Sequence, residues 1–355
     1  MTPLHYLFGQ PQASADLRTH NSDFIVQEIL PFLPTGEGEH HMLHIRKSGL
    51  NTADVARMLS SFAGVHPKEV TFAGQKDRHA ITEQWFGIRI PGKSMPDWQS
   101  LNSEQLTVLS SARHGKKLRT GALAGNRFTL TLRAVSDMDE VVRRLELIKH
   151  TGVPNYFGEQ RFGHDGKNLI FGRQMLNGSK KVKDRNKRSI YLSAVRSHLF
   201  NQVVSERLRQ FELKVLEGDC VMLAGSKSYF VANPWDEALH KRLDEQDILL
   251  SAPLWGRGQA LCEAEALTFE QSVCEPFAED CAGLEQAGLN QERRPLILLP
   301  QQLSYEINDD TLVLKFALPA GSFATSVLRE LVDYQDVKER EFQARRAAAS
   351  EQAHD

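Results

Sequence analysis

Apolar and polar residues alternate along several short stretches of the first 150 residues. This alternation predicts strands at 23–30, 40–47, 68–74, 83–90 and 125–135. Helical spacing of apolar residues instead predicts helices at 51–64 and 137–150. Because strands and helices do not follow each other in a regular βαβ order, we expect an α+β fold with a mixed, largely antiparallel sheet.

The helix predicted at 51–64 has recognisable ends. Thr52 is placed to cap its N-terminus, and Gly64 is placed to stop it. Its apolar stripe consists of Val55, Met58, Leu59 and Phe62. We therefore expect one face of this helix to pack against the rest of the domain.

The middle of the chain forms a segment with a different pattern. Gly and Pro interrupt the alternation at 150–158, and a long helix is predicted at 191–211. The acidic, alanine-rich stretch 236–290 predicts exposed helices. Alternation returns in "TLVLKFALPAG" from Thr311, so we expect a middle segment inserted into a domain that the C-terminal part completes. The charged tail beyond Asp336 is expected to fray.

A net charge of −2 hides a strong segregation of charge along the chain. Between Gln105 and Ser136 there is no acid, and the basic residues there are Arg113, Lys116, Lys117, Arg119, Arg127 and Arg133. A second basic stretch, with Asp184 as its single acid, holds Lys180, Lys181, Lys183, Arg185, Lys187 and Arg188. Two such stretches on a near-neutral protein indicate a polyanion ligand, with solvated basic loops as the alternative.

The sequence lacks the usual signals of several classes of protein. The longest apolar runs are too short for a membrane span, and the N-terminus lacks the pattern of a secretion signal, so we expect a cytoplasmic protein. The four cysteines lack CxxC spacing, and His40, His41 and His44 have no acidic partner at metal spacing, so we expect no metal site. Motifs of nucleotide hydrolysis, dinucleotide binding and α/β-hydrolase chemistry are missing.

Asp77 lies between Lys76 and Arg78 in "TFAGQKDRHAIT", on a loop between two predicted strands. Flanking cations favour its ionised form, which suits a nucleophile or a base. The alternative is a charged turn in which the carboxylate binds its own backbone.

A second candidate stretch is "NYFGEQRFGHDGKN", residues 155–168, which mixes aromatic residues such as Tyr156 with Arg161 and amide side chains. This mixture suits stacking and recognition of unstacked bases. A buried aromatic loop at a domain hinge is the alternative.

Seven stretches together resemble one family, the TruD tRNA pseudouridine synthases. They are "DFIVQEIL", "GEHHMLHIRKSGLNTADVA", "FAGQKDRHAITEQWF", "GNRF", "NYFGEQRFG", "RSIYLSAVRSHLFN" and "LPAGSFATSVLREL". They extend from about residue 17 to residue 332 in the family's order, whereas 236–300 carries little recognisable motif. Their combination is specific, although no single stretch would be.

The resemblance implies an enzyme that converts uridine to pseudouridine in tRNA, typically at position 13 of the D stem, after flipping the base from its stem. Asp77 matches the catalytic aspartate, which would assist cleavage of the N1–C1′ bond before the base turns and C5 bonds to C1′. The matching substrate-binding positions are Arg18, Phe24, Asn126, Phe128 and Phe323. Among them, Arg18 matches a basic residue that pairs with this aspartate in the family, and many members have lysine at that place. The residues that we expect to contact RNA are Lys76, Arg78, Tyr156, Arg161, Lys180 and Lys181.

The resemblance also implies a domain organisation. A discontinuous catalytic domain of pseudouridine-synthase type would comprise 1–151 and 305–345, a second α+β domain, 152–304, would be inserted, and 346–355 would be a frayed tail. An isomerisation requires no cofactor or metal. We expect tRNA as the partner, no membrane, no obligatory protein partner and a monomer.

Two other functions stay open at this point. One is a non-catalytic tRNA-binding or RNA-chaperone protein that uses the same basic surface. The other is a hydrolase of a nucleoside N-glycosidic bond, although no second acid lies at glycosidase-like motif spacing.

Overall fold

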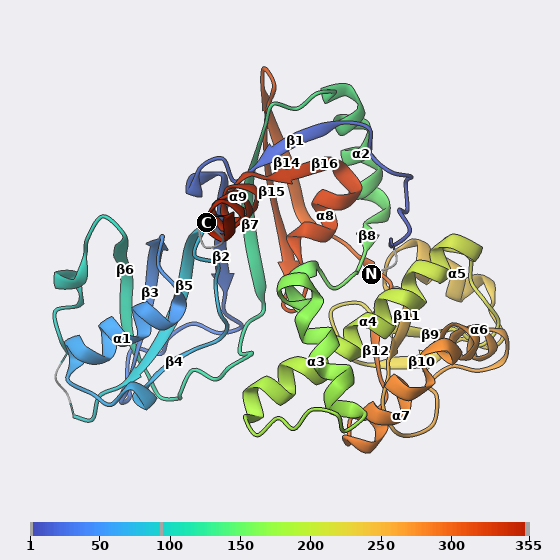
Figure 1. Ribbon diagram of the computed structural model, residues 1–355, viewed down its shortest axis with the longest axis horizontal. Helices are drawn as coiled ribbons and strands as arrows, with labels where there is room; N and C mark the ends of the chain where they lie inside the picture. The colour runs from blue at the N-terminus through green and yellow to red at the C-terminus, as the bar shows by residue number, and fades with distance from the viewer. Residues whose placement is uncertain (1–2, 93–94, 352–355) are drawn as a thin grey trace. The chain divides into compact units, whose positions relative to one another are not determined.

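The computed structural model describes residues 3–92 and 95–351 (Figure 1). Their contacts divide the chain into two compact units. The sheet unit comprises Gln12–Arg143, Pro300–Gly321 and Val332–Asp355. The helical unit comprises Met1–Pro11, Arg144–Leu299 and Ser322–Leu331. Each unit is therefore assembled from three separate segments of the chain.

A ten-stranded sheet forms the centre of the sheet unit within the described residues. Its main path, in spatial order, is β14 (Gln301–Asn308), β15 (Thr311–Pro319), β7 (Gly125–Arg133), β2 (Phe24–Ile29), β5 (Ile81–Arg89), β3 (His40–Ser48) and β6 (Leu106–His114). Beside this path, β1 (Ser14–Leu17) pairs with β7 and with β16 (Asp333–Asp336), and β4 (Val70–Phe72) pairs with β5.

The pairing in this sheet is antiparallel except between β2 and β5 and between β1 and β16. The expected α+β fold with a mixed, largely antiparallel sheet is confirmed. The helices of this unit are α1 (Thr52–Ala63), the first part of α2 (Met138–Thr151) and α9 (Val337–Glu351), with 3₁₀ helices η1 (Asn21–Asp23), η2 (Pro67–Glu69) and η3 (Trp98–Leu101).

Alternation in the sequence explains why β7 occupies the middle of the sheet. Phe128, Leu130 and Leu132 are buried, whereas Thr129 and Thr131 between them are only half-buried. Strands β2 and β15 flank β7 on its two sides. Burying every second side chain of three neighbouring strands builds one apolar face, which fixes the register of the sheet.

Helix α1 corrects two details of the sequence prediction. Its N-cap is Asn51, and Thr52 lies inside the helix with its hydroxyl directed to Gln84. The predicted stripe is buried at Val55 and Leu59, but Met58 and Phe62 are exposed. The helix therefore contacts the sheet with a narrower face than its apolar pattern suggests. The predicted stop at Gly64 is confirmed, with φ of 63°.

The helical unit packs helices around smaller sheets. Its helices are α3 (Lys167–Leu176), α4 (Arg185–Phe211), α5 (Glu237–Asp244), α6 (Ala264–Cys274), α7 (Ala278–Gln286) and α8 (Ala324–Leu331). Its 3₁₀ helices are η4 (Glu159–Phe162), η5 (His164–Gly166) and η6 (Glu275–Phe277). Its strands form the order β10 (Tyr229–Val231), β9 (Cys220–Leu223), β11 (Ile248–Leu254), β12 (Glu292–Pro295) and a separate pair β13 (Ile297–Leu298) with β8 (Val153–Pro154).

The prediction of exposed helices at 236–290 is only partly right. Strand β11 lies within this stretch, and its residues Ile248, Leu250 and Ala252 belong to the core of the unit. The acidic composition misled because exposed acids such as Glu237, Glu265 and Glu279 lie on α5 to α7, whereas the short β11 carries none.

The predicted domain boundaries concern functional domains, and they stay a prediction. The contact units differ from them in placing the first eleven residues and Ser322–Leu331 with the middle segment. In the expected tail, 346–355, α9 continues to Glu351, and residues 352–355 lie outside the described part. Among the described helices, none combines the length and apolar character needed to span a bilayer.

Candidate active site

The loop that carries Asp77 leaves the sheet where the neighbour of β5 changes. The first half of β5 pairs with β2 from Ile81 to Glu83, and the second half pairs with β4 from Phe86 to Ile88. Between these two pairings, the backbone N–H of Trp85 donates to Glu28 Oε2 at 2.8 Å. The Glu28 side chain thus supplies the acceptor that a paired strand would otherwise provide at Trp85. The loop 73–80, which joins β4 to β5, leaves the sheet beside this position.

Buried polar side chains fasten this loop, which we call the Asp77 loop (residues 73–80). Thr52 Oγ1 accepts from the Lys76 N–H at 2.9 Å, and Gln84 Nε2 donates to the Gly74 carbonyl at 2.6 Å. Lys47 Nζ donates to the Asp77 carbonyl at 3.1 Å and to the Leu50 carbonyl at 2.8 Å. These bonds come from α1, β5 and β3, so the backbone of the loop is held from three elements.

The carboxylate of Asp77 is held at both oxygens. Oδ1 accepts from the backbone N–H of His79 at 2.9 Å. Oδ2 lies 3.1 Å from Nη2 of Arg18, and the side chain is 29% exposed. The residue therefore binds its own backbone, as a charged turn would, and also faces a cation, as a reactive carboxylate would. Its position is fixed while one side stays open to a ligand.

Arg18 joins Asp77 to a second carboxylate. Its Nη1 donates to Asp336 Oδ2 at 2.6 Å, and its Cζ lies 4.1 Å from the centroid of the Phe24 ring. The backbone of Arg18 has φ of 59°, a left-handed conformation that is uncommon for a residue with a side chain. Its Nε is buried without a hydrogen-bond partner. Such strain and an unsatisfied donor are features that folded proteins tend to keep at functional sites.

Aromatic rings continue from Arg18 across the sheet. Phe24 meets Phe128 edge-on with centroids 6.4 Å apart, and Phe128 stacks on Phe316 at 5.4 Å. Asn126, two residues before Phe128 on β7, has its Oδ1 buried without a partner. The sheet unit thus brings together four of the predicted residues, Asp77, Arg18, Phe24 and Phe128, and the sheet register places Asn126 opposite Glu28.

Comparison with known proteins shows the family to which this chain belongs. The sequence model of the family described as tRNA pseudouridine synthase D (TruD) matches residues 3–182 and 175–331. The chain belongs to the TruD family. A tRNA pseudouridine synthase D of Shewanella oneidensis is 68% identical over 343 residues, covering 97% of this chain and 92% of that protein. Another from Aeromonas salmonicida is 51% identical, covering 94% of this chain and 95% of that protein.

A solved structure shows the same fold. The crystal structure of the putative tRNA pseudouridine synthase D (TruD) from Methanosarcina mazei matches with a TM-score of 0.73 at 22% sequence identity. The match covers 92% of this chain and 95% of that chain. Pseudouridine synthases are isomerases, so membership of the TruD family places this chain in that class of enzyme.

Lys76 is largely buried, whereas a residue that contacts RNA would be expected to be exposed. Its Nζ lies 2.5 Å from Glu28 Oε1, with side-chain exposures of 10% and 0%, respectively. The two groups form a buried ion pair. Burial raises the pKa of Glu28, and the charge of Lys76 opposes that shift. Lys76 in this TruD chain therefore ties the Asp77 loop to β2. Arg78 is exposed, and its Nε donates to the Gly49 carbonyl.

The other predicted residues lie in the helical unit. Tyr156 is 2% exposed and donates its hydroxyl to the His5 carbonyl, which favours the buried-loop alternative over base stacking. Phe323 is half-buried and meets Phe157 edge-on at 6.0 Å, with Arg161 over both rings. Lys180 lies over the ring of Phe171 at 3.8 Å.

Lys181 is exposed in the segment between α3 and α4, in the basic stretch identified from the sequence.

Sequence reasoning missed Lys47, Glu28 and Asp336. Lys47 carries a detectable signal, because it follows Leu43 and Ile45 at alternate positions of β3 and thus occupies a core-facing place. It is 1% exposed, and burial lowers its pKa to about 8. Asp336 carries no such signal, since it is 318 residues from Arg18 in the sequence.

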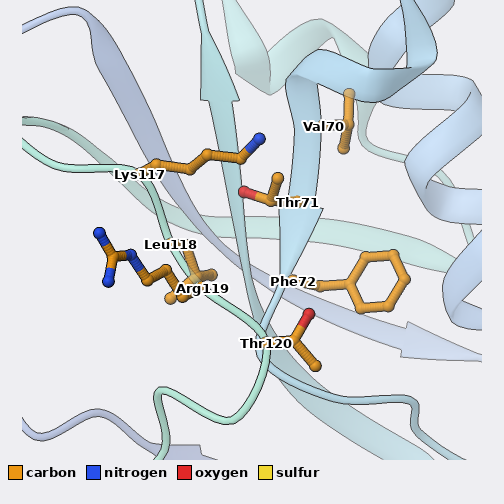
Figure 2. Close-up of a pocket in the computed structure, with 7 residues that line it drawn as sticks. All are labelled: Val70, Thr71, Phe72, Lys117, Leu118, Arg119 and Thr120. Carbon is orange, nitrogen blue, oxygen red and sulfur yellow. The ribbon is translucent and has the colours of Figure 1, made fainter. Parts of the chain in front are cut away.

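A surface hollow opens beside β4, close to where the Asp77 loop begins (Figure 2). Its walls come from β4 and from the loop before β7, and its lining residues are Val70, Thr71, Phe72, Lys117, Leu118, Arg119 and Thr120. The Gly121 N–H donates to the Ala73 carbonyl at 2.7 Å, which joins the two walls. The side chains of Lys117 and Arg119 give this hollow a positive character.

Metal-ligating side chains do not gather anywhere in residues 3–92 and 95–344, whose side chains the structure describes. In these ranges, no group of three or more His, Cys, Asp or Glu is arranged to hold an ion. The four cysteines, Cys220, Cys262, Cys274 and Cys281, are buried and free.

Proposed function

We propose that this member of the TruD family isomerises uridine to pseudouridine in tRNA, at position 13 of the D stem. The observation that carries the proposal is the carboxylate of Asp77, which is fixed at 3.1 Å from Arg18 beside the aromatic rings of β2 and β7. Membership of the family and the names of its relatives, tRNA pseudouridine synthases D, support tRNA as the substrate.

The reaction rearranges bonds without a net change in atoms. The N1–C1′ bond breaks, the uracil turns, C5 bonds to C1′, and the proton lost from C5 is balanced by one gained at N1. Asp77 can assist by attacking C1′ of the sugar, as retaining glycosidases do, or by removing the C2′ proton to give a glycal. Deuterium at C2′ slows only the second route, which makes the two distinguishable.

The neighbours of Asp77 suit either route. Arg18 orients the carboxylate of Asp77, because its guanidinium group lies 3.1 Å from Oδ2. Phe24 and Phe128 supply an apolar wall that would keep water from a detached uracil. Asn126 Oδ1, a buried acceptor without a partner, would accept an N–H from the base.

The test is pseudouridine mapping on an unmodified tRNA transcript, with Asp77→Asn as the isosteric variant. We expect the wild-type protein to modify position 13, and we expect Asp77→Asn to lose at least about 10³-fold in rate, as when a nucleophile or base is removed. A transcript with cytidine at position 13 serves as the matched substrate control.

Each alternative function has its own signature in this experiment. Release of free uracil would identify a hydrolase, and tight binding of tRNA without any product would identify a non-catalytic binding protein. Undiminished product from Asp77→Asn would contradict the role of Asp77, and product only at other uridines would contradict position 13.

A further inference from the structure

Arg161 is a partly buried cation that the helical unit does not neutralise. Its Cζ lies 5.3 Å from the centroid of the Phe157 ring and 5.7 Å from that of Phe323. Nη1 donates to Ser193 Oγ at 3.0 Å, whereas Nε is buried without a hydrogen-bond partner. The guanidinium group thus has aromatic faces and one hydroxyl around it, but no described carboxylate at ion-pair distance.

Two other arginines of the same unit make this arrangement unusual. Arg207 also lies over two rings, and it forms a bidentate pair with Asp219 at 2.6 and 3.0 Å. Arg329 lies over Tyr6 and Tyr156 and pairs with Glu330 at 2.5 Å. At these two arginines, aromatic contact therefore accompanies a carboxylate and does not replace it. A desolvated cation without an anion is costly, which suggests that the anion comes from a ligand.

A second guanidinium group increases the positive potential around Arg161. Arg294 lies over the same Phe157 ring, at 4.2 Å, and its Nη2 donates to Asn155 Oδ1 at 2.5 Å. Burial lowers the pKa of Arg294 to about 9, and the charge of Arg161 adds to this effect. Two cations on one ring repel each other, and an anion between or beside them would relieve that repulsion.

The surroundings fit an anion that belongs to RNA. Phe323, half-buried beside Arg161, offers a ring on which an unstacked base can lie. Ser193 lies on α4, and the basic residues Lys187 and Arg188 precede it on that helix by six and five residues. At a rise of 1.5 Å per residue, they lie about 8–9 Å from Ser193 along the axis. A phosphate contact next to a stacking ring is a common mode of single-strand recognition.

We propose that Arg161 binds a phosphate of the RNA backbone, and that Phe157 and Phe323 orient its guanidinium group for this contact. This inference rests on the proposed function, since it assigns the phosphate to the tRNA substrate. Arg161 acts here as a binding residue and not as a reacting group.

The test measures how the affinity for an unmodified tRNA transcript depends on potassium chloride concentration. Arg161→Gln should weaken binding about tenfold at moderate salt and lower the log–log slope by about one unit, since one phosphate contact is lost. Arg161→Lys keeps the charge and should keep the slope. The matched control is Arg173→Gln, which removes an arginine of α3 that is paired with Asp280 and should leave affinity and slope unchanged.

Thermal melting of each variant separates binding from folding. A wild-type slope in Arg161→Gln with unchanged melting would make Arg161 a structural residue and overturn the inference. If Arg161→Gln does not fold, Arg161→Lys decides, because a slope lowered by a full unit in that variant contradicts a charge contact with phosphate. Absence of pseudouridine from wild-type reactions would instead contradict the proposed function, whatever the slopes.

Discussion

At the scale of single residues, the position of Asp77 depends on Arg18, which forms ion pairs with both Asp77 and Asp336. The guanidinium group lies 2.6 Å from Asp336 and 3.1 Å from Asp77, so Asp336 is the closer anchor. Asp336 also accepts from the N–H groups of Lys338 and Glu339 at the start of α9. One carboxylate thus caps a helix and orients the cation that faces Asp77.

Replacing Asp336 separates these two tasks. Asp336→Asn keeps an oxygen for the helix cap but removes the charge, so Arg18 loses its closer ion pair. We expect the single-turnover rate of pseudouridine formation to fall about tenfold, with tRNA affinity within about twofold. Asp336→Ala should show the same loss of rate and should also lower stability by about 1 kcal/mol, because the cap is lost. Equal changes in rate and affinity for Asp336→Asn would contradict a positioning role.

Residue-scale prediction from the sequence succeeded where chemistry was local or carried by motifs. The pairing of Arg18 with Asp77 was implied by the family resemblance, and the structure places the two side chains together. Asp336 and Glu28 could not be found in this way. Asp336 reaches Arg18 only through the parallel pairing of β1 with β16, which closes after more than 300 residues of chain.

At the scale of elements, alternation and apolar runs predicted β2, β3, β4, β5, β7 and β15 of the sheet unit. They did not predict β1, β6, β14 or β16. They could not predict that β5 changes its neighbour from β2 to β4, since this depends on pairing and not on the pattern of either strand. The same limit explains the errors at Thr52 and at Met58, where tertiary contacts override a local signal. The gap beside β5, and with it the place of the Asp77 loop, therefore required the structure.

Lys47 links β3 to the Asp77 loop, so its removal should affect the loop more than the sheet. Lys47→Met leaves the carbonyls of Asp77 and Leu50 without this donor. We expect about a tenfold or greater loss in the rate of isomerisation while tRNA affinity is kept, measured in single-turnover reactions. An exposed lysine of the same unit, Lys116, gives the matched control as Lys116→Met, which should leave the rate unchanged.

The buried amine also predicts a dependence of stability on pH. Burial lowers the pKa of Lys47 to about 8, while Asp77, Glu28 and Asp54 raise it and Lys76 lowers it. Between pH 8 and the ordinary lysine value near 10.4, the unfolded chain binds more protons than the folded one, so stability rises with pH in this window. Relative to Lys47→Met, the wild type should gain at most about 3 kcal/mol of unfolding free energy from pH 8 to 10.5.

Urea denaturation at several pH values measures this gain. The difference between wild type and Lys116→Met, by contrast, should stay constant over the same pH range. A difference between wild type and Lys47→Met that shrinks as pH rises would contradict the sign of the shift.

At the scale of the whole molecule, each unit has its own distribution of charge. In the sheet unit, Arg133 is neutralised by Asp23 at 2.8 Å, and Lys117 and Arg119 line the hollow beside β4. In the helical unit, Lys180, Lys181 and Lys183 precede α4, whereas acids dominate α6 and α7. The near-zero net charge therefore conceals local potentials that can hold a polyanion.

Charge reversal separates these local potentials from the total charge. The triple variant Lys180→Glu, Lys181→Glu and Lys183→Glu should weaken tRNA binding and flatten its salt dependence, by roughly one unit of slope for each lysine that contacts a phosphate. The control reverses three exposed lysines elsewhere in the same unit, Lys214, Lys227 and Lys241, for an identical change in net charge. If net charge alone attracted tRNA, both variants would weaken binding equally. If the stretch before α4 holds RNA, only the first variant loses slope, while an unchanged slope in the first variant would place that stretch off the RNA.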